Sequence, residues 1–213
     1  AQQVEVMVSE ENGKATILVA GSGPAGLSAA LALAEAGVRT VLAGPPPSIS
    51  DKRTTALMRP AVAFLERLGI GEALGPNVAA PLATMRIVDA TTRLIRGPAV
   101  TFRAAEIGED YFGLNIPNAV LNAALADAIR ARNDIVWHET MVEAWHPGIN
   151  HVEARLTNGT TVRAALAVAA DGRNSPARKA AGISVTTRRL PQSALVLNFA
   201  HQRHHGFTST EFH

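Results

Sequence analysis

A glycine-rich turn between two apolar segments limits the fold of this chain more than any other feature of its sequence. Residues 14–44 read KATILVAGSGPAGLSAALALAEAGVRTVLAG. The run 15–20 predicts a strand, the alanine- and leucine-rich segment 23–36 predicts a helix that Gly37 ends, and residues 39–42 predict a second strand. The turn between the first strand and the helix is Gly21-Ser22-Gly23-Pro24-Ala25-Gly26. This order of elements indicates an α/β fold with a parallel sheet.

The three glycines of the turn have the spacing G-x-G-x-x-G, which has a physical mechanism in this context. Gly21 allows a tight turn, Gly23 lets the backbone approach a pyrophosphate, and Gly26 lets the helix pack close to the strand. The helix N-terminus then presents N–H groups and a partial positive charge to the phosphates. The sequence therefore predicts a dinucleotide-binding turn. The alternative, a turn that only packs the unit, is weaker because three glycines at this spacing lack a purely structural need.

The acidic residue that usually completes such a site is missing. An Asp or Glu about 20 positions after the first glycine ordinarily holds a ribose hydroxyl at the end of the second strand. Leu42-Ala43-Gly44 and three prolines occupy this place, while Glu35 lies within the predicted helix and Asp51 lies beyond the prolines. We therefore expect the adenosine end of the site to be held differently.

The composition excludes several other classes of protein. Of the 213 residues, 47% are apolar and 18% are charged, as in globular proteins. A net charge of +2 with scattered arginines does not indicate nucleic-acid binding. Without cysteine there is no disulfide, no catalytic thiolate and no cysteine-bound zinc. No apolar run reaches the roughly 18 residues of a membrane span, and the polar residues 1–13 predict a mobile tail rather than a signal peptide.

The rest of the chain predicts further helices and strands. Residues 58–68 predict a helix, and Asn118 is expected to cap an amphipathic helix with Leu121, Leu125 and Ile129 on one stripe. Asn158-Gly159 predicts the turn of a hairpin. Strands are predicted at 84–88, 93–95, 99–103 and 111–116, as a small antiparallel sheet, and at 135–138, 141–145, 151–156, 160–163, 193–200 and the end of the chain.

An all-apolar run, 165–170, leads directly into Asp171-Gly172. Such a run is typical of a strand buried in a parallel sheet. A short helix is predicted over 176–181. Taken alone, Asp171 is either a functional residue at the end of a buried strand or a cap of this helix.

Five segments together resemble a known family. They read, in order, GSGPAG, DKRTTALMRPAVAFLERLGI, FGLNIPNAVLNAAL, AVAADGRNSPARKAAGI and SALVLNFAHQRHHGFTSTEFH. They resemble the FAD-dependent aromatic hydroxylases, and most of all the ubiquinone-biosynthesis branch, over nearly all of residues 15–213. The resemblance implies a Rossmann-like FAD-binding domain of the glutathione-reductase βαβ type, interleaved with part of an α+β substrate domain. The implied FAD-binding segments are 14–80 and 118–182, and the implied substrate-domain segments are 81–117 and 183–213.

The resemblance also implies contacts with the cofactor. Asp171 and Gly172 would lie beside the FAD pyrophosphate, which the turn Gly21–Gly26 would cradle. Arg53, by itself a surface arginine, would lie near the ribityl–pyrophosphate part of FAD. The backbone near Val142 would contact the adenine.

The activity that the resemblance implies is that of an FAD-dependent monooxygenase. NAD(P)H would reduce FAD, the reduced flavin would react with O2 to a C4a-hydroperoxide, and the distal oxygen would pass to a phenol-like aromatic substrate. Because the cofactor carries this chemistry, no catalytic residue can be named. The implied location is cytoplasmic, and the resemblance leaves open a peripheral association with the inner membrane, partner proteins and a homodimer.

The chain departs from this family in its length. A third motif, Gly-Asp-Ala, would lie beyond residue 213, so the sequence resembles the N-terminal half of a family member. We therefore expect these residues to bind FAD weakly or not at all and to be inactive alone. Two other functions stay open, a flavin-dependent reductase of the same fold and a non-catalytic nucleotide-binding or scaffold module.

Two groups of side chains have simpler explanations than ligand binding. His201, His204 and His205, with His213 beyond them, lack a carboxylate at ligand spacing, so no metal site is predicted. Trp137 and Trp145 fall on predicted strands and are expected to pack there.

Overall fold

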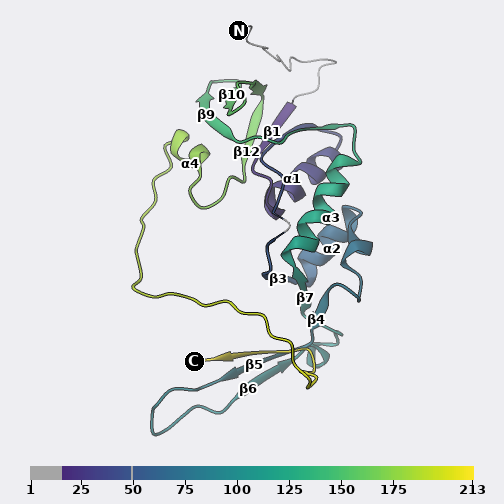
Figure 1. Cartoon of the computed structure of the whole chain (residues 1–213), viewed down its shortest axis with the longest axis vertical. Helices are drawn as coiled ribbons and strands as arrows, with labels where there is room; N and C mark the ends of the chain where they lie inside the picture. The colour runs from purple at the N-terminus through teal and green to yellow at the C-terminus, as the bar shows by residue number, and fades with distance from the viewer. Residues whose placement is uncertain (1–15, 49) are drawn as a thin grey trace. The chain divides into compact units, whose positions relative to one another are not determined.

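The computed structural model describes residues 16–48 and 50–213, so the predicted tail 1–13 lies outside the described residues. The chain divides into two compact units, each built from two separate segments (Figure 1). The described part of the first unit comprises 16–48 and Asn122–Ser193, and the second unit comprises Ser50–Leu121 and Ala194–His213. Segments of the two units thus alternate along the chain. The assignment of FAD-binding and substrate domains at the predicted boundaries stays a prediction.

A parallel sheet forms the centre of the first unit. Its order is β12-β1-β2-β8, with all neighbours parallel. The apolar run before the glycine turn forms β1, and its central residues Leu18 and Val19 are fully buried. The bounds are β1 (Thr16–Ala20), α1 (Pro24–Glu35), β2 (Arg39–Ala43), β8 (Ile135–His138) and β12 (Leu166–Ala169). These elements confirm the predicted Rossmann-like α/β architecture.

A small antiparallel sheet covers one face of the parallel sheet. It consists of β9 (Val142–Pro147), β10 (Val152–Leu156) and β11 (Thr161–Ala164), and the predicted Asn158-Gly159 turn joins the last two. Its buried side chains form one cluster with Leu18, Val41 and Ala43 of the parallel sheet. Because side chains alternate along a strand, Val19 and Leu42 lie on the opposite face, where α1 packs. The glycine turn therefore sits on a core that is closed on both faces.

The second unit contains two three-stranded sheets. One has the order β3-β7-β4 and is antiparallel, and the other, β13-β5-β6, combines a parallel and an antiparallel pair. α2 (Arg59–Arg67) follows β3 directly. α3 (Asn118–Arg130) follows β7, and from Asn122 on it belongs to the first unit. The strands are β3 (Thr54–Met58), β4 (Ala80–Leu82), β5 (Thr84–Val88), β6 (Val100–Arg103), β7 (Gly113–Pro117) and β13 (Thr208–Phe212), with single 3-10 turns at Gly71–Leu74 and Ala104–Ile107.

Several sequence predictions for strands were wrong. Residues 93–95 lie in the loop between β5 and β6, and residues 193–200 form no regular element. β7 pairs with β3 and β4 rather than joining β5 and β6, and neither β3 nor β4 was predicted. β12 pairs in parallel as expected, but it is an edge strand whose Leu166 is 57% exposed, so the prediction of a buried strand was wrong. An apolar run does not reveal which of its faces a neighbouring strand will cover.

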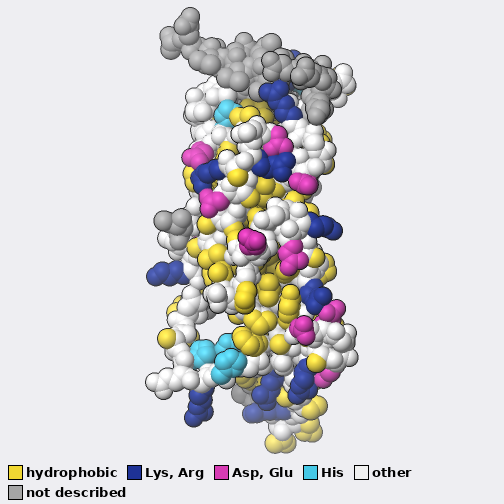
Figure 2. Space-filling model, turned by 90° about the vertical axis from the view of Figure 1, so that its right-hand side faces the viewer, with side chains coloured by type: hydrophobic (Ala, Val, Ile, Leu, Met, Phe, Trp, Pro, Cys, Tyr) yellow, Lys and Arg dark blue, Asp and Glu magenta, His cyan; other side chains and the backbone are white. Residues whose placement is uncertain are grey.

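Side chains of both charges are scattered among apolar ones on the face that Figure 2 shows. Across residues 16–48 and 50–213, no helix combines the length and the apolar character that a membrane span requires.

Candidate functional site

The glycine turn lies at the carboxyl edge of the parallel sheet. Gly21 follows β1, and its N–H donates to the carbonyl of Ala43, the last residue of β2, over 2.7 Å. On the other side, the N–H of Ala170, just after β12, donates to the carbonyl of Ala20 over 2.7 Å. The turn is thus held between the ends of its two neighbouring strands. In open α/β sheets this edge is where ligands bind.

Two of the three glycines are required by packing alone. Gly21 has a φ of +108°, and a Cβ there would lie 2.1 Å from the carbonyl oxygen of Ala170. A Cβ on Gly26 would lie 1.8 Å from the carbonyl oxygen of Gly21. The sequence argument that all three glycines lack a structural need is therefore wrong for these two. They set the path of the backbone but do not by themselves indicate a ligand.

Gly23 is different, because the protein does not need a glycine there. Its φ is −74°, a value that any residue adopts, and a Cβ would meet no atom within 4 Å. Gly23, Pro24 and Ala25 are also exposed. The space above this turn would be filled by a side chain if the position carried one. A glycine at this place leaves room for a pyrophosphate to approach the backbone.

The N-terminus of α1 has the character of an anion site. Gly23 is the N-cap residue, so no side chain caps this end, and the first turn contains no acidic residue. Pro24 occupies the first helical position, where its missing N–H is not needed. The partial positive charge of this 12-residue helix is therefore not offset by a capping or acidic side chain. Its N-terminus and the open space at Gly23 fit the diphosphate of a dinucleotide.

The missing acid after β2 has a steric explanation. A Cβ on Gly44 would lie 2.6 Å from Oγ and 2.7 Å from the backbone nitrogen of Ser22. Ser22 is buried, and its hydroxyl donates to the carbonyl of Pro45. The carbonyl of Gly44 accepts from Nε1 of Trp137 over 2.9 Å. No side chain fits directly after β2 while Ser22 occupies this place, so a carboxylate cannot stand there.

Asp171 lies next to the glycine turn. A Cβ on Gly21 would come within 2.9 Å of the backbone nitrogen of Asp171, which places this residue against the start of the turn. One carboxylate oxygen of Asp171 accepts from the N–H of Ala177, at the start of α4 (Pro176–Ala180), over 3.0 Å. This bond supports the helix-cap alternative as one role of Asp171. A contact of Asp171 and Gly172 with the cofactor stays a prediction.

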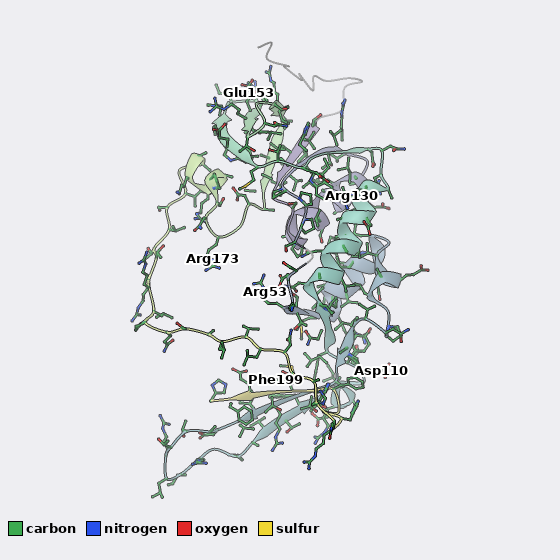
Figure 3. The ribbon with its side chains drawn as sticks, in the orientation of Figure 1. Arg53, Asp110, Arg130, Glu153, Arg173 and Phe199 are labelled. Atoms are coloured by element: carbon green, nitrogen blue, oxygen red, sulfur yellow. The ribbon has the colours of Figure 1, made fainter. Side chains whose placement is uncertain are left out.

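The remaining predicted site residues lie farther along the chain. Val142 is the first residue of β9 and pairs with Leu156 beside a register shift. Arg53 belongs to the second unit, immediately before β3, and its side chain is 70% exposed. Figure 3 shows this side chain extending from the ribbon. The cofactor contacts of Arg53 and Val142 stay predictions.

Sequence reasoning missed several side chains around these positions. Trp137, which was expected only to pack, also holds Gly44 through its indole N–H, and the guanidinium of Arg130 stacks 4.9 Å from its ring centre. His138 carries a pKa lowered by burial. Asn118 begins α3, and its side chain bonds to Thr55 and Asp51. The bonds of Trp137 to Gly44 and of Asn118 to Thr55 and Asp51 have no signal in the sequence, because their partners are distant along the chain.

The histidines of 201–205 contact each other rather than a cluster of carboxylates. The rings of His201 and His205 lie 5.3 Å apart, and those of His204 and His205 stack at 5.5 Å. His204 and His205 also contact the ring of Phe207. Among the residues that the structure describes, no group of three or more His, Asp or Glu side chains could hold a metal ion.

Comparison with known proteins agrees with this geometry. Residues 14–207 match the model of a family described as the FAD binding domain. The chain belongs to this family. It is 31% identical over 198 residues to ubiquinone hydroxylase UbiL of Rhodospirillum rubrum, covering 90% of the chain and 45% of the relative. It is 29% identical over 190 residues to 3-demethoxyubiquinol 3-hydroxylase of Escherichia coli, covering 85% of the chain and 47% of the relative.

The fold is shared with solved flavoprotein structures. p-Nitrophenol 4-monooxygenase PnpA of Pseudomonas putida superimposes with a TM-score of 0.64 at 24% identity, over 79% of this chain and 43% of PnpA. At this identity the likeness shows the fold alone. The chain spans about half the length of the curated relatives that it matches.

Proposed function

We propose that this chain is the FAD-binding part of a flavin-dependent aromatic hydroxylase. The observation that carries the proposal is Gly23, a glycine without a structural requirement, exposed at an uncapped helix N-terminus on the ligand-binding edge of a parallel sheet. Membership of the FAD-binding family and the similarity to ubiquinone hydroxylases support it. The same residues would equally fit the diphosphate of any dinucleotide, and the family match favours FAD.

The residues present fit this cofactor. The turn Gly21–Gly26 and the N-terminus of α1 would hold the pyrophosphate, with Asp171 and Gly172 beside it and Arg53 as a further cation. The backbone near Val142 would contact the adenine. FAD, when bound, supplies the hydride acceptance and the oxygen activation that no side chain provides. The task of the chain is to bind and orient the cofactor.

The whole protein would use NAD(P)H, O2 and an aromatic substrate of the phenol or polyprenylphenol class. This proposal is supported by the names of the relatives, which are hydroxylases of ubiquinone or demethoxyubiquinol. A lipophilic substrate of this kind would favour a cytoplasmic protein that associates peripherally with the inner membrane. A homodimer and association with partner proteins are part of the same proposal.

Two measurements test the proposed function. Titration with FAD of the chain extended to the length of its relatives, followed by flavin fluorescence, should show saturable binding that Gly23→Ala weakens. NAD(P)H oxidation should depend on a phenolic substrate when the chain is extended to the length of its relatives. Absence of FAD binding by the extended chain would contradict the FAD-binding assignment. NAD(P)H oxidation without hydroxylated product would contradict the hydroxylase and indicate a flavin-dependent reductase.

A further inference from the structure

The loop between β5 and β6 exposes two large apolar side chains next to each other. Leu94 is 99% exposed and Ile95 is 87% exposed. They lie near the middle of residues 89–99, which connect the two strands and extend beyond their ends (Figure 1). Single exposed apolar side chains are ordinary on protein surfaces. Two adjacent ones that are almost wholly exposed leave apolar area in water that a contact could cover.

Arginines flank this apolar pair on both sides. The sequence at the tip of the loop is Arg93-Leu94-Ile95-Arg96, and both arginines are exposed. Residues 90–105 contain a third arginine and neither Asp nor Glu. The tip therefore combines an apolar centre with positive charge. This combination favours the surface of an anionic lipid bilayer, which attracts both kinds of side chain.

The base of the loop is tied together by one carboxylate. One oxygen of Asp89 accepts from the N–H of Thr91 over 3.0 Å, and the other accepts from the N–H of Gly97 over 2.9 Å. The N–H of Ala90 also donates to the carbonyl of His213, at the end of β13, over 2.6 Å. The tip is thus presented by a loop whose two ends are already fixed. Less conformational entropy is lost when such a loop binds.

The shape of this surface favours a bilayer over a protein partner. A stable protein–protein interface buries about 800 Å² on each side and is centred on well-packed anchor residues. Leu94 and Ile95 are only two side chains, and they stand at the tip of a protruding loop between two arginines. A pair of this kind can insert among lipid headgroups while the long arginine side chains reach the phosphates.

We propose that the tip Arg93–Arg96 contacts an anionic phospholipid bilayer. Leu94 and Ile95 would enter the boundary between headgroups and acyl chains, and the two arginines would lie at the level of the phosphates. This inference rests on the peripheral membrane association in the proposed function and names the residues that make it. It does not depend on FAD binding. The contact should be weak and reversible, since even a single myristoyl chain gives only marginal membrane binding.

Co-sedimentation with vesicles tests the contact, using the chain extended to the length of its relatives. The extended chain should bind vesicles of phosphatidylethanolamine and phosphatidylglycerol more strongly than vesicles of phosphatidylcholine, and added salt should reduce the difference. Leu94→Ser and Ile95→Ser should each lower the partition coefficient by about tenfold. Arg96→Gln should lower it by about fivefold, on the anionic vesicles only.

Ile149 supplies the matched control. It is 100% exposed in the loop between β9 and β10, and residues 140–154 contain neither Lys nor Arg. Ile149→Ser should therefore leave vesicle binding unchanged. The melting temperature of Leu94→Ser without vesicles should equal that of the wild type, because the side chain is exposed. A lower melting temperature would mean that other residues of the extended chain cover the tip, which would overturn the inference.

The outcomes separate this inference from the proposed function. Unchanged vesicle binding by Leu94→Ser and Ile95→Ser, or an equal loss in Ile149→Ser, would overturn the contact at the tip and leave peripheral association standing. If the wild-type extended chain binds neither kind of vesicle, the contact and the peripheral association both fail. The FAD-binding assignment would remain, because Gly23→Ala tests it without a membrane.

Discussion

Replacing Gly23 by alanine adds a single methyl group, which should weaken the binding of the cofactor but still allow the chain to fold. The added Cβ meets no protein atom within 4 Å, and the φ of −74° suits alanine. The expected cost to the chain without FAD is the loss of a favourable N-cap residue, about 0.5–1 kcal/mol of unfolding free energy. Folding should therefore survive the substitution.

The same substitution, Gly23→Ala, should weaken the binding of FAD. A phosphate oxygen that accepts from a backbone N–H lies about 2.9 Å from the nitrogen, whereas carbon atoms pack at about 3.5–4.0 Å. The methyl group of the alanine and the phosphate would therefore compete for the same space next to the backbone of the turn. We expect FAD to bind at least about tenfold more weakly, a loss of about 1.4 kcal/mol.

Two other glycines supply the controls. At Gly26 a Cβ would lie 1.8 Å from the carbonyl oxygen of Gly21, so Gly26→Ala should destabilise the chain without FAD, by about 1–3 kcal/mol as other overpacked sites do. At Gly97, in a loop of the second unit, the atom nearest to an added Cβ lies 3.8 Å away. Gly97→Ala should therefore change neither the stability of the chain nor its affinity for FAD. The assays are urea unfolding without FAD and fluorescence titration with FAD. Unchanged FAD affinity in Gly23→Ala, or a loss of stability as large as in Gly26→Ala, would refute the reasoning.

Asp171→Ala should lower the unfolding free energy by about 1 kcal/mol through the lost bond to the N–H of Ala177. It should lower the melting temperature more with FAD than without it, and equal losses would leave Asp171 as a helix cap only. Burial lowers the pKa of His138, so the unfolding free energy should fall as the pH drops below about 6.5. His138→Asn should flatten this pH dependence, measured by urea unfolding, and an unchanged dependence would contradict the assignment to His138. Leu156→Ala should cost about 2–5 kcal/mol, by urea unfolding, because Leu156 is fully buried in the core cluster.

The sequence was sufficient to predict those elements whose structure depends on residues that are neighbours along the chain. The strand, glycine turn and helix of 16–35 depend on local apolar periodicity and backbone freedom, and the structure reproduces them within a residue or two. The hairpin at Asn158-Gly159 likewise follows from the turn alone. The local signals that predicted these elements are the same ones that stabilise them.

The sequence was insufficient to predict features that depend on contacts between segments distant along the chain. β12 has the composition of a central strand but stands at an edge, because no further strand pairs with its other side in the described sheet. Residues 193–200 are mostly apolar, yet without a pairing partner they form no strand. The exclusion of a side chain at Gly44 depends on Ser22, and Asp51, the ion-pair partner of Arg53, accepts a hydrogen bond from Asn118. Such contacts arise only when the fold brings the partners together.

The central claim is that the glycine turn binds the diphosphate of FAD, and competition between nucleotides tests it most directly. A flavin held by this turn must engage through its pyrophosphate and adenosine parts, which FAD has and FMN lacks. In equilibrium titrations of the chain extended to the length of its relatives, the account predicts saturable FAD binding that ADP displaces and that FMN does not match. If FMN binds as tightly as FAD, or if ADP fails to displace FAD, the turn is not the site and the account is contradicted.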